Sequence, residues 1–313
     1  MTSVANFQAP CPARYDVALR DHTTFRMGGK VPVLLEPRNR DELIAAVRRL
    51  HADHIRYRML GGGANILIDD SGLDEAIVLT TGFAFMVRES EDATELRLGA
   101  GLSIPQFVTK TREMGLTGAE CLVGVPGTMG GATVMNAGGR HGWLSSIAKR
   151  VRYLTPALDE QEDAVTERTF GYRSSMFDAC VVLETVVALQ RDAPKAVQER
   201  IKTILKEKSA AQPLIEPSAG CIFKNPEGQS AGRLIEAAGL KGARVGDAEV
   251  STKHGNFIVN RGAATFRDVI QLIRHVRKGV LEHSGADLHT EVKIWSREPL
   301  DLPTSSAPCA RTS

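Results

Sequence analysis

The segment of residues 124–138 constrains this chain more than any other, because glycines crowd it and bulky side chains are few. It reads GVPGTMGGATVMNAG. Glycine loses more conformational freedom on folding than any other residue, so this density indicates a place where a ligand approaches the main chain closely. Backbone N–H groups without side chains around them form nests that hold anions, most often phosphates. The segment therefore predicts a phosphate-binding loop.

A second glycine-rich stretch, LGGGAN at residues 60–65, follows an apolar run at 55–60 that is typical of a strand. Its bare backbone amides offer a second phosphate-sized nest. Two such loops in one chain indicate a dinucleotide cofactor.

A third stretch, GAG at residues 99–101, lies between a predicted strand and a predicted helix and imitates the start of the Rossmann fingerprint. That fingerprint needs a third glycine where helix and strand pack closely, and Ile104 stands at this position. We therefore interpret residues 99–101 as a plain strand-to-helix turn.

Composition excludes several classes of protein. The chain has 313 residues, enough for about two domains, with a net charge of +2 and 5% aromatic residues, so nothing indicates a nucleic-acid surface. It has no long basic run, no signal-like amino terminus and no apolar run of membrane-spanning length. Its 5 cysteines lack a Cys-x-x-Cys spacing, and its 8 histidines form no spaced set. We expect a cytoplasmic globular protein without a metal site, a disulfide framework or an obligate protein partner.

Strand and helix patterns alternate from about residue 20 to residue 298, which predicts an α+β fold in two lobes. A charged amphipathic helix at 194–211 separates the lobes, because both glycine-rich loops precede it. Residues 1–19 and 299–313 are rich in Pro, Ser, Thr and Ala and are predicted to be loose tails. The other helices are expected at 41–51, between 103 and 115, at 231–238 and at 265–283, and strands at 55–60, 95–98, 181–189, 256–260 and 291–295.

Three isolated polar residues are candidates for chemistry, and each has a plainer alternative. Arg173, in FGYRSS, is either a functional cation or a member of a surface ion pair. Cys221, in SAGCIFKNP, either faces a cleft or is a buried structural cysteine. Glu291, in HTEVKIW, is either functional or a solvent-facing residue on the strand face opposite Val292 and Ile294. Singly, none of them decides a function.

Other conspicuous residues have simple structural interpretations. Cys121, beside the main glycine loop, is interpreted as a small packing residue. The charges of residues 48–49 and 206–208 are interpreted as solvated helix faces.

Taken together, the motifs resemble the UDP-N-acetylenolpyruvoylglucosamine reductase (MurB) family over about residues 20–296. Several ordered motifs spread over both lobes are far more specific than a single glycine loop. The matching segments are TTFRMGG at 23–29, LGGGAN at 60–65, GVPGTMGGA at 124–132, NAG at 136–138, YR at 172–173, SAGCIFKNP at 218–226, AGRLIEAAGLKG at 231–242, HGNF at 254–257 and EV at 291–292.

The resemblance implies a fold and an activity. The fold is an FAD-binding lobe of the vanillyl-alcohol oxidase (PCMH) type at 20–195, with subdomains at about 20–82 and 83–195, and a smaller α+β UDP-sugar lobe at 208–298. In the family, NADPH reduces non-covalently bound FAD, which then reduces the enolpyruvyl group of UDP-N-acetylglucosamine enolpyruvate to give UDP-N-acetylmuramate. This UDP-N-acetylmuramate dehydrogenase reaction supplies peptidoglycan synthesis, and through it cell-wall biogenesis, cell shape and cell division.

The resemblance also implies the residues of the site. Arg173 and Glu291 would stabilise the negative charge that develops beside the substrate's carboxylate. Cys221, where the family more often has serine, would act as the general acid. Substrate contacts are expected from Tyr172 and Asn225, with Lys224 as a weaker candidate. The expected FAD-binding residues are Leu60, Gly61, Gly62, Gly63, Ala64, Asn65, Gly124, Val125, Pro126, Gly127, Thr128, Gly130, Gly131, Asn136, Ala137 and Gly138.

Two alternative functions stay open at this point. A flavin oxidase of the same fold superfamily often binds its cofactor through a histidine in the first glycine loop, whereas Ala64 and Asn65 stand there, so no covalent link is expected. A catalytically silent flavin- or UDP-sugar-binding protein is favoured only by the change from serine to Cys221. The intact Arg173 and Glu291 argue against it.

Overall fold

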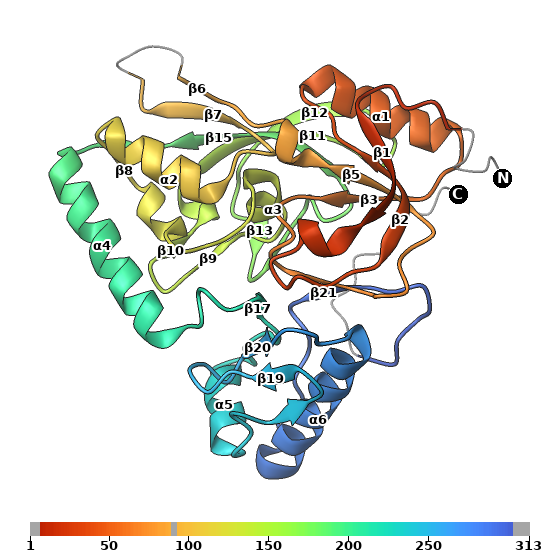
Figure 1. Cartoon of the computed structure of the whole chain (residues 1–313). Helices are drawn as coiled ribbons and strands as arrows, with labels where there is room; N and C mark the ends of the chain where they lie inside the picture. Colours follow the sequence, from red (N-terminus) through yellow and green to blue (C-terminus); the bar gives the residue numbers. More distant parts are fainter. Residues whose placement is uncertain (1–6, 89–92, 303–313) are drawn as a thin grey trace.

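The computed structural model describes residues 7–88 and 93–302. A larger lobe, coloured red to green in Figure 1, carries both glycine-rich loops, and a smaller blue lobe lies beside it. Each lobe combines sheets with helices, which confirms the predicted α+β class. Within the described ranges, no helix has both the length and the apolar character that crossing a membrane requires.

The first sheet of the larger lobe has four strands in the order β1-β2-β5-β3. Strand β1 is antiparallel to β2, whereas β2, β5 and β3 run parallel. Helix α1 connects β2 to β3, and the Asn39 side chain caps its first turn by accepting a hydrogen bond from the backbone of Glu42 at 2.9 Å. The bounds are β1 (Ala13–Ala18), β2 (Lys30–Leu35), α1 (Arg40–Ala52), β3 (Tyr57–Leu60) and β5 (Ala76–Leu79).

Strand β1 corrects the prediction that residues 1–19 form a loose tail. It pairs with β2 over most of its length, and Phe7, ahead of it, is buried in the core. The prediction failed because β1 is an edge strand with exposed polar residues, so it lacks a continuous apolar pattern. At the other end, Leu302 is buried against the smaller lobe. The rest of the two predicted tails, residues 1–6 and 303–313, lies outside the described residues.

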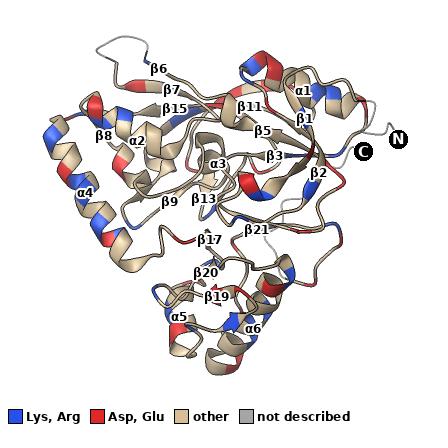
Figure 2. Ribbon diagram, viewed as in Figure 1, with Lys and Arg blue, Asp and Glu red and all other residues tan. Residues whose placement is uncertain are grey.

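The second sheet is antiparallel, in the order β12-β11-β15-β7-β6, and helices α2, α3 and α4 accompany it. Its central strand β15 is buried on both faces, and the hydroxyls of Thr133 in α3 and Thr185 in β15 lie 2.7 Å apart. The apolar side of α4 packs on this lobe, and charged residues of both signs occur along the length of the helix (Figure 2). The bounds are β6 (Met86–Arg88), β7 (Glu95–Gly99), α2 (Ile104–Glu113), α3 (Met129–Val134), β11 (Ala148–Leu154), β12 (Glu160–Ala164), β15 (Val181–Ala188) and α4 (Pro194–Ala211).

Short elements complete the larger lobe and connect its sheets. They are the 3-10 helices η2 (Leu19–His22), η3 (Thr80–Gly82), η4 (Ala119–Leu122) and η5 (Leu144–Ser146), and the strands β4 (Ile66–Ile68), β8 (Leu116–Thr117), β9 (Gly138–Gly139), β10 (Gly142–Trp143), β13 (Phe170–Gly171), β14 (Ser174–Ser175) and β16 (Gln190–Arg191).

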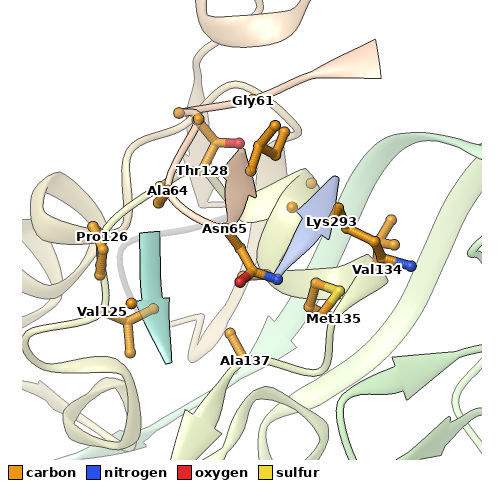
Figure 3. Close-up of a pocket in the computed structure, with 18 of the residues that line it drawn as sticks. Gly61, Ala64, Asn65, Val125, Pro126, Thr128, Val134, Met135, Ala137 and Lys293 are labelled. Carbon is orange, nitrogen blue, oxygen red and sulfur yellow. The ribbon is translucent and has the colours of Figure 1, made fainter. Parts of the chain in front are cut away.

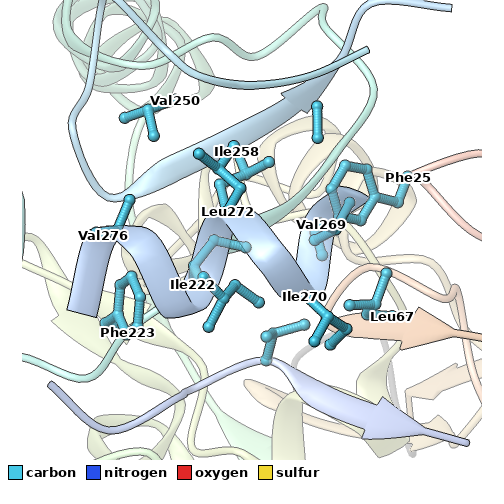
Figure 4. Close-up of a cluster of buried hydrophobic side chains, with 14 of the residues drawn as sticks. Phe25, Leu67, Ile222, Phe223, Val250, Ile258, Val269, Ile270, Leu272 and Val276 are labelled. Atoms are coloured by element: carbon cyan, nitrogen blue, oxygen red, sulfur yellow. The ribbon is translucent and has the colours of Figure 1, made fainter. Parts of the chain in front are cut away.

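The smaller lobe is an antiparallel sheet, β17-β20-β19-β18, packed on helices α5 and α6. Helix α6 begins with a capping box between Thr265 and Asp268 and ends at Gly285, whose φ of 73° suits glycine. Figure 4 shows that Phe25 and Leu67 from the larger lobe enter the core around α6. The bounds are β17 (Ser218–Cys221), α5 (Ala231–Ala237), β18 (Arg244–Val245), β19 (Ala248–Val250), β20 (Phe257–Asn260) and α6 (Phe266–Ser284).

After α6 the chain returns to the larger lobe. Strand β21 (Lys293–Trp295) pairs in parallel with β4, so that Lys293 lies opposite Ile66. The backbone N–H of Lys293 also donates to the carbonyl of Asn65 at 3.0 Å. This pairing places residues 293–295 directly beside the first glycine-rich loop.

Candidate active site

A cavity of about 450 Å³ is lined by residues of both lobes. The two glycine-rich loops form one part of its wall, and β17 with the segment before β21 forms another. Figure 3 shows Ala64 and Asn65 of the first loop and Val125, Pro126 and Thr128 of the second around this space, with Lys293 beside them. Sequence segments more than 200 residues apart therefore share one site.

The two loops touch each other through their main chains, which explains the glycines. A Cβ on Gly62 would lie 2.7 Å from the Cα of Gly127, and a Cβ on Gly61 would lie 2.4 Å from the Oγ1 of Thr128. Gly131 differs, because a Cβ there would meet only Thr128 Oγ1, at 3.8 Å, and Gly131 lines the cavity. Some glycines are thus required by the loop contact, while Gly131 leaves room for a ligand.

The loops suit the diphosphate of FAD. The hydroxyl of Thr128 is buried at the cavity wall and has no hydrogen-bond partner among the described residues. A buried polar group of this kind normally has a partner, so it indicates a missing acceptor or donor at this point. Bare backbone amides next to an unpartnered hydroxyl form a nest for a phosphate oxygen.

Most of the expected FAD-binding residues line the cavity, and two do not. Leu60 is fully buried in the core under the first sheet. Asn136 donates through Nδ2 to the carbonyl of Gly171 at 3.0 Å and accepts from the backbone N–H of Ser145 at 3.1 Å, so its side chain links the segment after α3 to β13 and η5. The residues that line the cavity are Gly61, Gly62, Gly63, Ala64, Asn65, Gly124, Val125, Pro126, Gly127, Thr128, Gly130, Gly131, Ala137 and Gly138.

Arg173, Cys221 and Glu291 all line this cavity, although they come from three separate segments. Arg173 lies between β13 and β14 with a φ of 53°, in the left-handed region that a non-glycine residue rarely adopts. Its Nε is 2.8 Å from Oε1 of Glu291, and its Nη1 donates to the carbonyl of Gly138 at 3.0 Å. The ion pair that the sequence left open is therefore present, but inside the cavity.

Glu291 is buried, with 7% of its surface exposed, so the alternative of a solvent-facing residue is wrong. The backbone N–H of Glu291 donates to the carbonyl of Ile222 at 2.7 Å, and the backbone carbonyl of Glu291 accepts from Nδ2 of Asn65 at 3.2 Å. Burial raises the pKa of the Glu291 carboxyl, while the nearby charge of Arg173 opposes the rise.

Cys221 ends β17 and has part of its surface open to the cavity. Burial, reinforced by the negative charge of Glu291, raises the pKa of the Cys221 thiol to about 12. The thiol therefore keeps its proton at neutral pH. A protonated group at the cavity wall has the property that a proton donor needs.

The three predicted substrate residues lie next to one another but outside the cavity lining. The Tyr172 hydroxyl accepts a hydrogen bond from the backbone of Asn225 at 3.3 Å, which links the larger lobe to the smaller one. The Oδ1 of Asn225 accepts from the backbone of Ala231 at the start of α5. Burial raises the pKa of Glu291, and the charge of Lys224, after that of Arg173, opposes this rise, so Lys224 acts electrostatically on the site.

Lys208 is a cavity residue that the sequence analysis missed. It was interpreted as part of a solvated helix face, whereas its Nζ donates to the carbonyl of Val123 at 2.6 Å and it lines the cavity. Burial, followed by repulsion from Arg173, lowers the pKa of the ammonium group. Only the tertiary packing of α4 beside the second glycine loop places Lys208 there. Its helix neighbour Lys206 is exposed, as expected, and so are Arg48 and Arg49.

Other missed residues lie near the first glycine loop. Trp295 and Lys293 line the cavity from β21, and Nζ of Lys293 is 3.2 Å from Asp178. The sequence does contain a signal for Lys293. Side chains alternate between the two faces of a strand, so Lys293 lies on the same face as the candidate residue Glu291. Cys121, by contrast, is buried in the core as a packing residue, as predicted.

Sequence comparisons identify the class of protein first. Residues 31–160 match the FAD binding domain family, and residues 212–295 match the family described as UDP-N-acetylenolpyruvoylglucosamine reductase, C-terminal domain. The cavity lies between these two matched regions. The chain is thus a flavin-dependent oxidoreductase with an added C-terminal lobe.

Whole-chain relatives narrow this class to one family. UDP-N-acetylenolpyruvoylglucosamine reductase 2 of Symbiobacterium thermophilum is 39% identical over 284 residues, which cover 90% of this chain and 91% of that protein. The reductase of Moorella thermoacetica is 40% identical over 280 residues, 88% of this chain and 91% of that protein. The crystal structure of the Thermus caldophilus reductase superposes with a TM-score of 0.77 at 35% identity, covering 91% of this chain and all of that one. The chain belongs to the UDP-N-acetylenolpyruvoylglucosamine reductase family.

Proposed function

We propose that this chain reduces the enolpyruvyl group of UDP-N-acetylglucosamine enolpyruvate to give UDP-N-acetylmuramate for peptidoglycan synthesis, with NADPH as the hydride donor. Family membership supports the reaction and FAD as the cofactor. One observation carries the assignment to residues: Arg173, Cys221 and Glu291 line the same cavity as both glycine-rich loops.

The glycine-rich loops and the Thr128 hydroxyl would hold the cofactor's diphosphate. When bound, FAD supplies a two-electron carrier that takes hydride from a nicotinamide and gives it to a carbon–carbon double bond. The protein's part is to orient the substrate, to stabilise charge and to supply a proton. We propose residues 20–195 as the FAD-binding domain, with subdomains at about 20–82 and 83–195, and residues 208–298 as the UDP-sugar domain; β1 and most of α4 lie outside these bounds and pack on the FAD-binding domain.

Arg173 would bind the substrate's carboxylate. Hydride addition at the terminal carbon leaves negative charge on the adjacent carbon and its carboxylate. The planar guanidinium matches both carboxylate oxygens, and the Gly138 carbonyl and Glu291 already hold it in place. Donors fixed in advance stabilise the developing charge without reorganising. In its protonated form, Glu291 would donate a further hydrogen bond to the same carboxylate.

Cys221 would supply the proton. The carbon next to the carboxylate gains a C–H bond as the Sγ–H bond of Cys221 breaks, and the electron pair of that bond stays on sulfur. The positive charge of Arg173 lowers the pKa of this thiol against the larger effect of burial, so it stabilises the thiolate that is formed. Tyr172, Lys224 and Asn225 are proposed to contact the UDP-sugar where the two lobes meet.

The absorption spectrum of the purified protein tests this function. We expect yellow, acid-releasable FAD that NADPH bleaches and that UDP-N-acetylglucosamine enolpyruvate restores to the oxidised spectrum. Bleaching by NADH in parallel measures the nicotinamide preference. A folded protein that stays colourless with excess FAD would contradict the proposal. Flavin that is bleached but never reoxidised by the substrate would instead indicate a binding protein without this activity.

A further inference from the structure

Trp143 contacts Arg173 without itself lining the cavity. The guanidinium carbon of Arg173 lies over the indole ring, 5.0 Å from its centroid. Tyr172 meets the same indole edge to face, with ring centroids 5.8 Å apart and an interplanar angle of 78°. A guanidinium over an aromatic face is attracted by the negative charge of that face, and most strongly so by tryptophan.

The same short hairpin supplies two of the contacts to Arg173. Trp143 in β10 pairs directly with Gly138 in β9, and the carbonyl of Gly138 accepts the hydrogen bond from Arg173 Nη1. The pairing is so close that a Cβ on Gly138 would lie 2.6 Å from the Cα of Trp143. Gly138 therefore accepts a hydrogen bond from the Arg173 guanidinium, and its strand partner Trp143 places an aromatic ring against the same guanidinium.

Contacts at its tip and at its base hold the backbone of the hairpin to neighbouring segments. At its tip, Nη2 of Arg140 is 2.7 Å from a carboxylate oxygen of Glu207 on α4. At its base, Leu144 donates through its backbone to Ala137 at 2.8 Å. The Ser146 hydroxyl donates to the carbonyl of Trp143 itself, also at 2.7 Å.

Arg173 needs such support. An arginine side chain has many rotamers, and binding both oxygens of a carboxylate with two guanidinium nitrogens requires one orientation of the side chain. The backbone of Arg173 is already held in the left-handed region, which persists only where the surroundings fix it. The contacts with Gly138, Glu291 and Trp143 together restrain the guanidinium before any ligand arrives.

We propose that Trp143 is a positioning residue that holds the Arg173 guanidinium in the orientation that receives the substrate's carboxylate. This inference rests on the proposed function, in which Arg173 binds that carboxylate. It follows that the indole favours UDP-sugars that carry a carboxylate over those that lack one. Its removal should then affect the first kind of ligand and spare the second.

The experiment compares two ligands on the oxidised holoenzyme. Dissociation constants for UDP-N-acetylglucosamine enolpyruvate and for UDP-N-acetylglucosamine are measured from the change in flavin absorbance. We expect Trp143→Leu and Trp143→Met to weaken the carboxylate-bearing ligand about tenfold, the effect of losing one cation–π contact, and to leave the other ligand unchanged. Trp143→Phe, which keeps an aromatic face, should lose at most about threefold.

A double-mutant cycle with Arg173→Gln separates this inference from the proposed function. In the Arg173→Gln background, Trp143→Leu should cause no further loss. If Arg173→Gln weakens the carboxylate-bearing ligand while neither Trp143→Leu nor Trp143→Met does, the positioning role is wrong and the function stands. If Arg173→Gln has no effect, the carboxylate role of Arg173 fails. Equal weakening of both ligands, or additive losses in the double variant, would also overturn the role of Trp143.

Discussion

Cys221 combines two properties at the scale of a single residue. It faces the cavity, and burial raises the pKa of its thiol to about 12. A group with so high a pKa is a poor nucleophile at neutral pH, because almost none of it is thiolate. The environment therefore keeps the thiol protonated, which is the form a proton donor must have, and disfavours the covalent chemistry for which cysteine is better known.

Substitution of Cys221 tests this role. We expect Cys221→Ala to lower turnover about 10²- to 10⁴-fold, the usual contribution of a general acid, and Cys221→Ser to keep substantial turnover. Flavin reduction by NADPH should be unchanged in both, because no proton from Cys221 enters that step. Stopped-flow absorbance separates the two half-reactions. Cys180→Ala, which removes a second thiol that lines the cavity, is the matched control. Near-normal turnover in Cys221→Ala would remove Cys221 from the mechanism.

The site residues show what sequence can and cannot provide. Local motifs singled out Arg173, Cys221 and Glu291 but left each of them open, the family resemblance gave them their expected roles, and the fold brings them to one cavity. Lys208 was misjudged because its helix neighbours are solvated and only the packing of α4 turns it inward. Trp143 carries no local signal, since its significance depends on a guanidinium from another hairpin.

Long helices with one regular apolar face were predicted well. Helix α4 begins and ends at the predicted residues, and α6 follows its predicted cap Thr265. Strand β12 was missed because its sequence, EQEDA, has no apolar alternation. It forms through charge pairing with β11, for example Arg152 with Glu162 at 2.7 Å. Propensity and period fail for an edge strand such as β12, which buries no apolar face, and the short buried strands β2 and β5 were not predicted either.

Helix α3 allows the fold and the ligand to be tested separately. Gly131→Ala replaces glycine in a helix at a position with free space, so we expect the apoprotein to gain about 0.5 to 1 kcal/mol of stability. The added methyl group should project into the cavity and weaken FAD binding. Gly62→Ala should instead destabilise the apoprotein, because its Cβ would meet the backbone of Gly127.

Urea unfolding of the apoprotein and FAD titration by fluorescence quenching measure the two effects. Gly139→Ala, where a Cβ would meet no atom within 4 Å, serves as the control for a neutral methyl group. Wild-type FAD affinity in Gly131→Ala would show that this glycine does not face the cofactor.

The two lobes share a core at the scale of the whole molecule. Phe25 is fully buried among residues of the smaller lobe, and its carbonyl accepts a hydrogen bond from Asn260. Thr24 likewise donates to the carbonyl of Ser218 at 2.7 Å. Such contacts couple the lobes, so the cavity between them depends on both being folded.

We expect one cooperative unfolding transition for the whole chain. Phe25→Ala should lower the free energy of unfolding by about 3 to 5 kcal/mol, as cavity formation in a core does. The substitution should lower the unfolding temperature of both lobes together. Val87→Ala, at a half-exposed position of β6, should change stability by less than about 0.5 kcal/mol. Differential scanning calorimetry distinguishes one endotherm from two, and two well-separated endotherms would contradict the coupling.

The pairing of β21 with β4 sets an order of events for a chain leaving the ribosome. The cavity wall from Glu291 to Trp295 emerges more than 200 residues after the loop that it completes. A contact between such distant segments forms late, because closing a long stretch of chain is entropically slow. The first glycine-rich loop therefore lacks this part of the cavity wall during most of translation. We therefore expect stable binding of FAD to be one of the last steps in maturation of the protein.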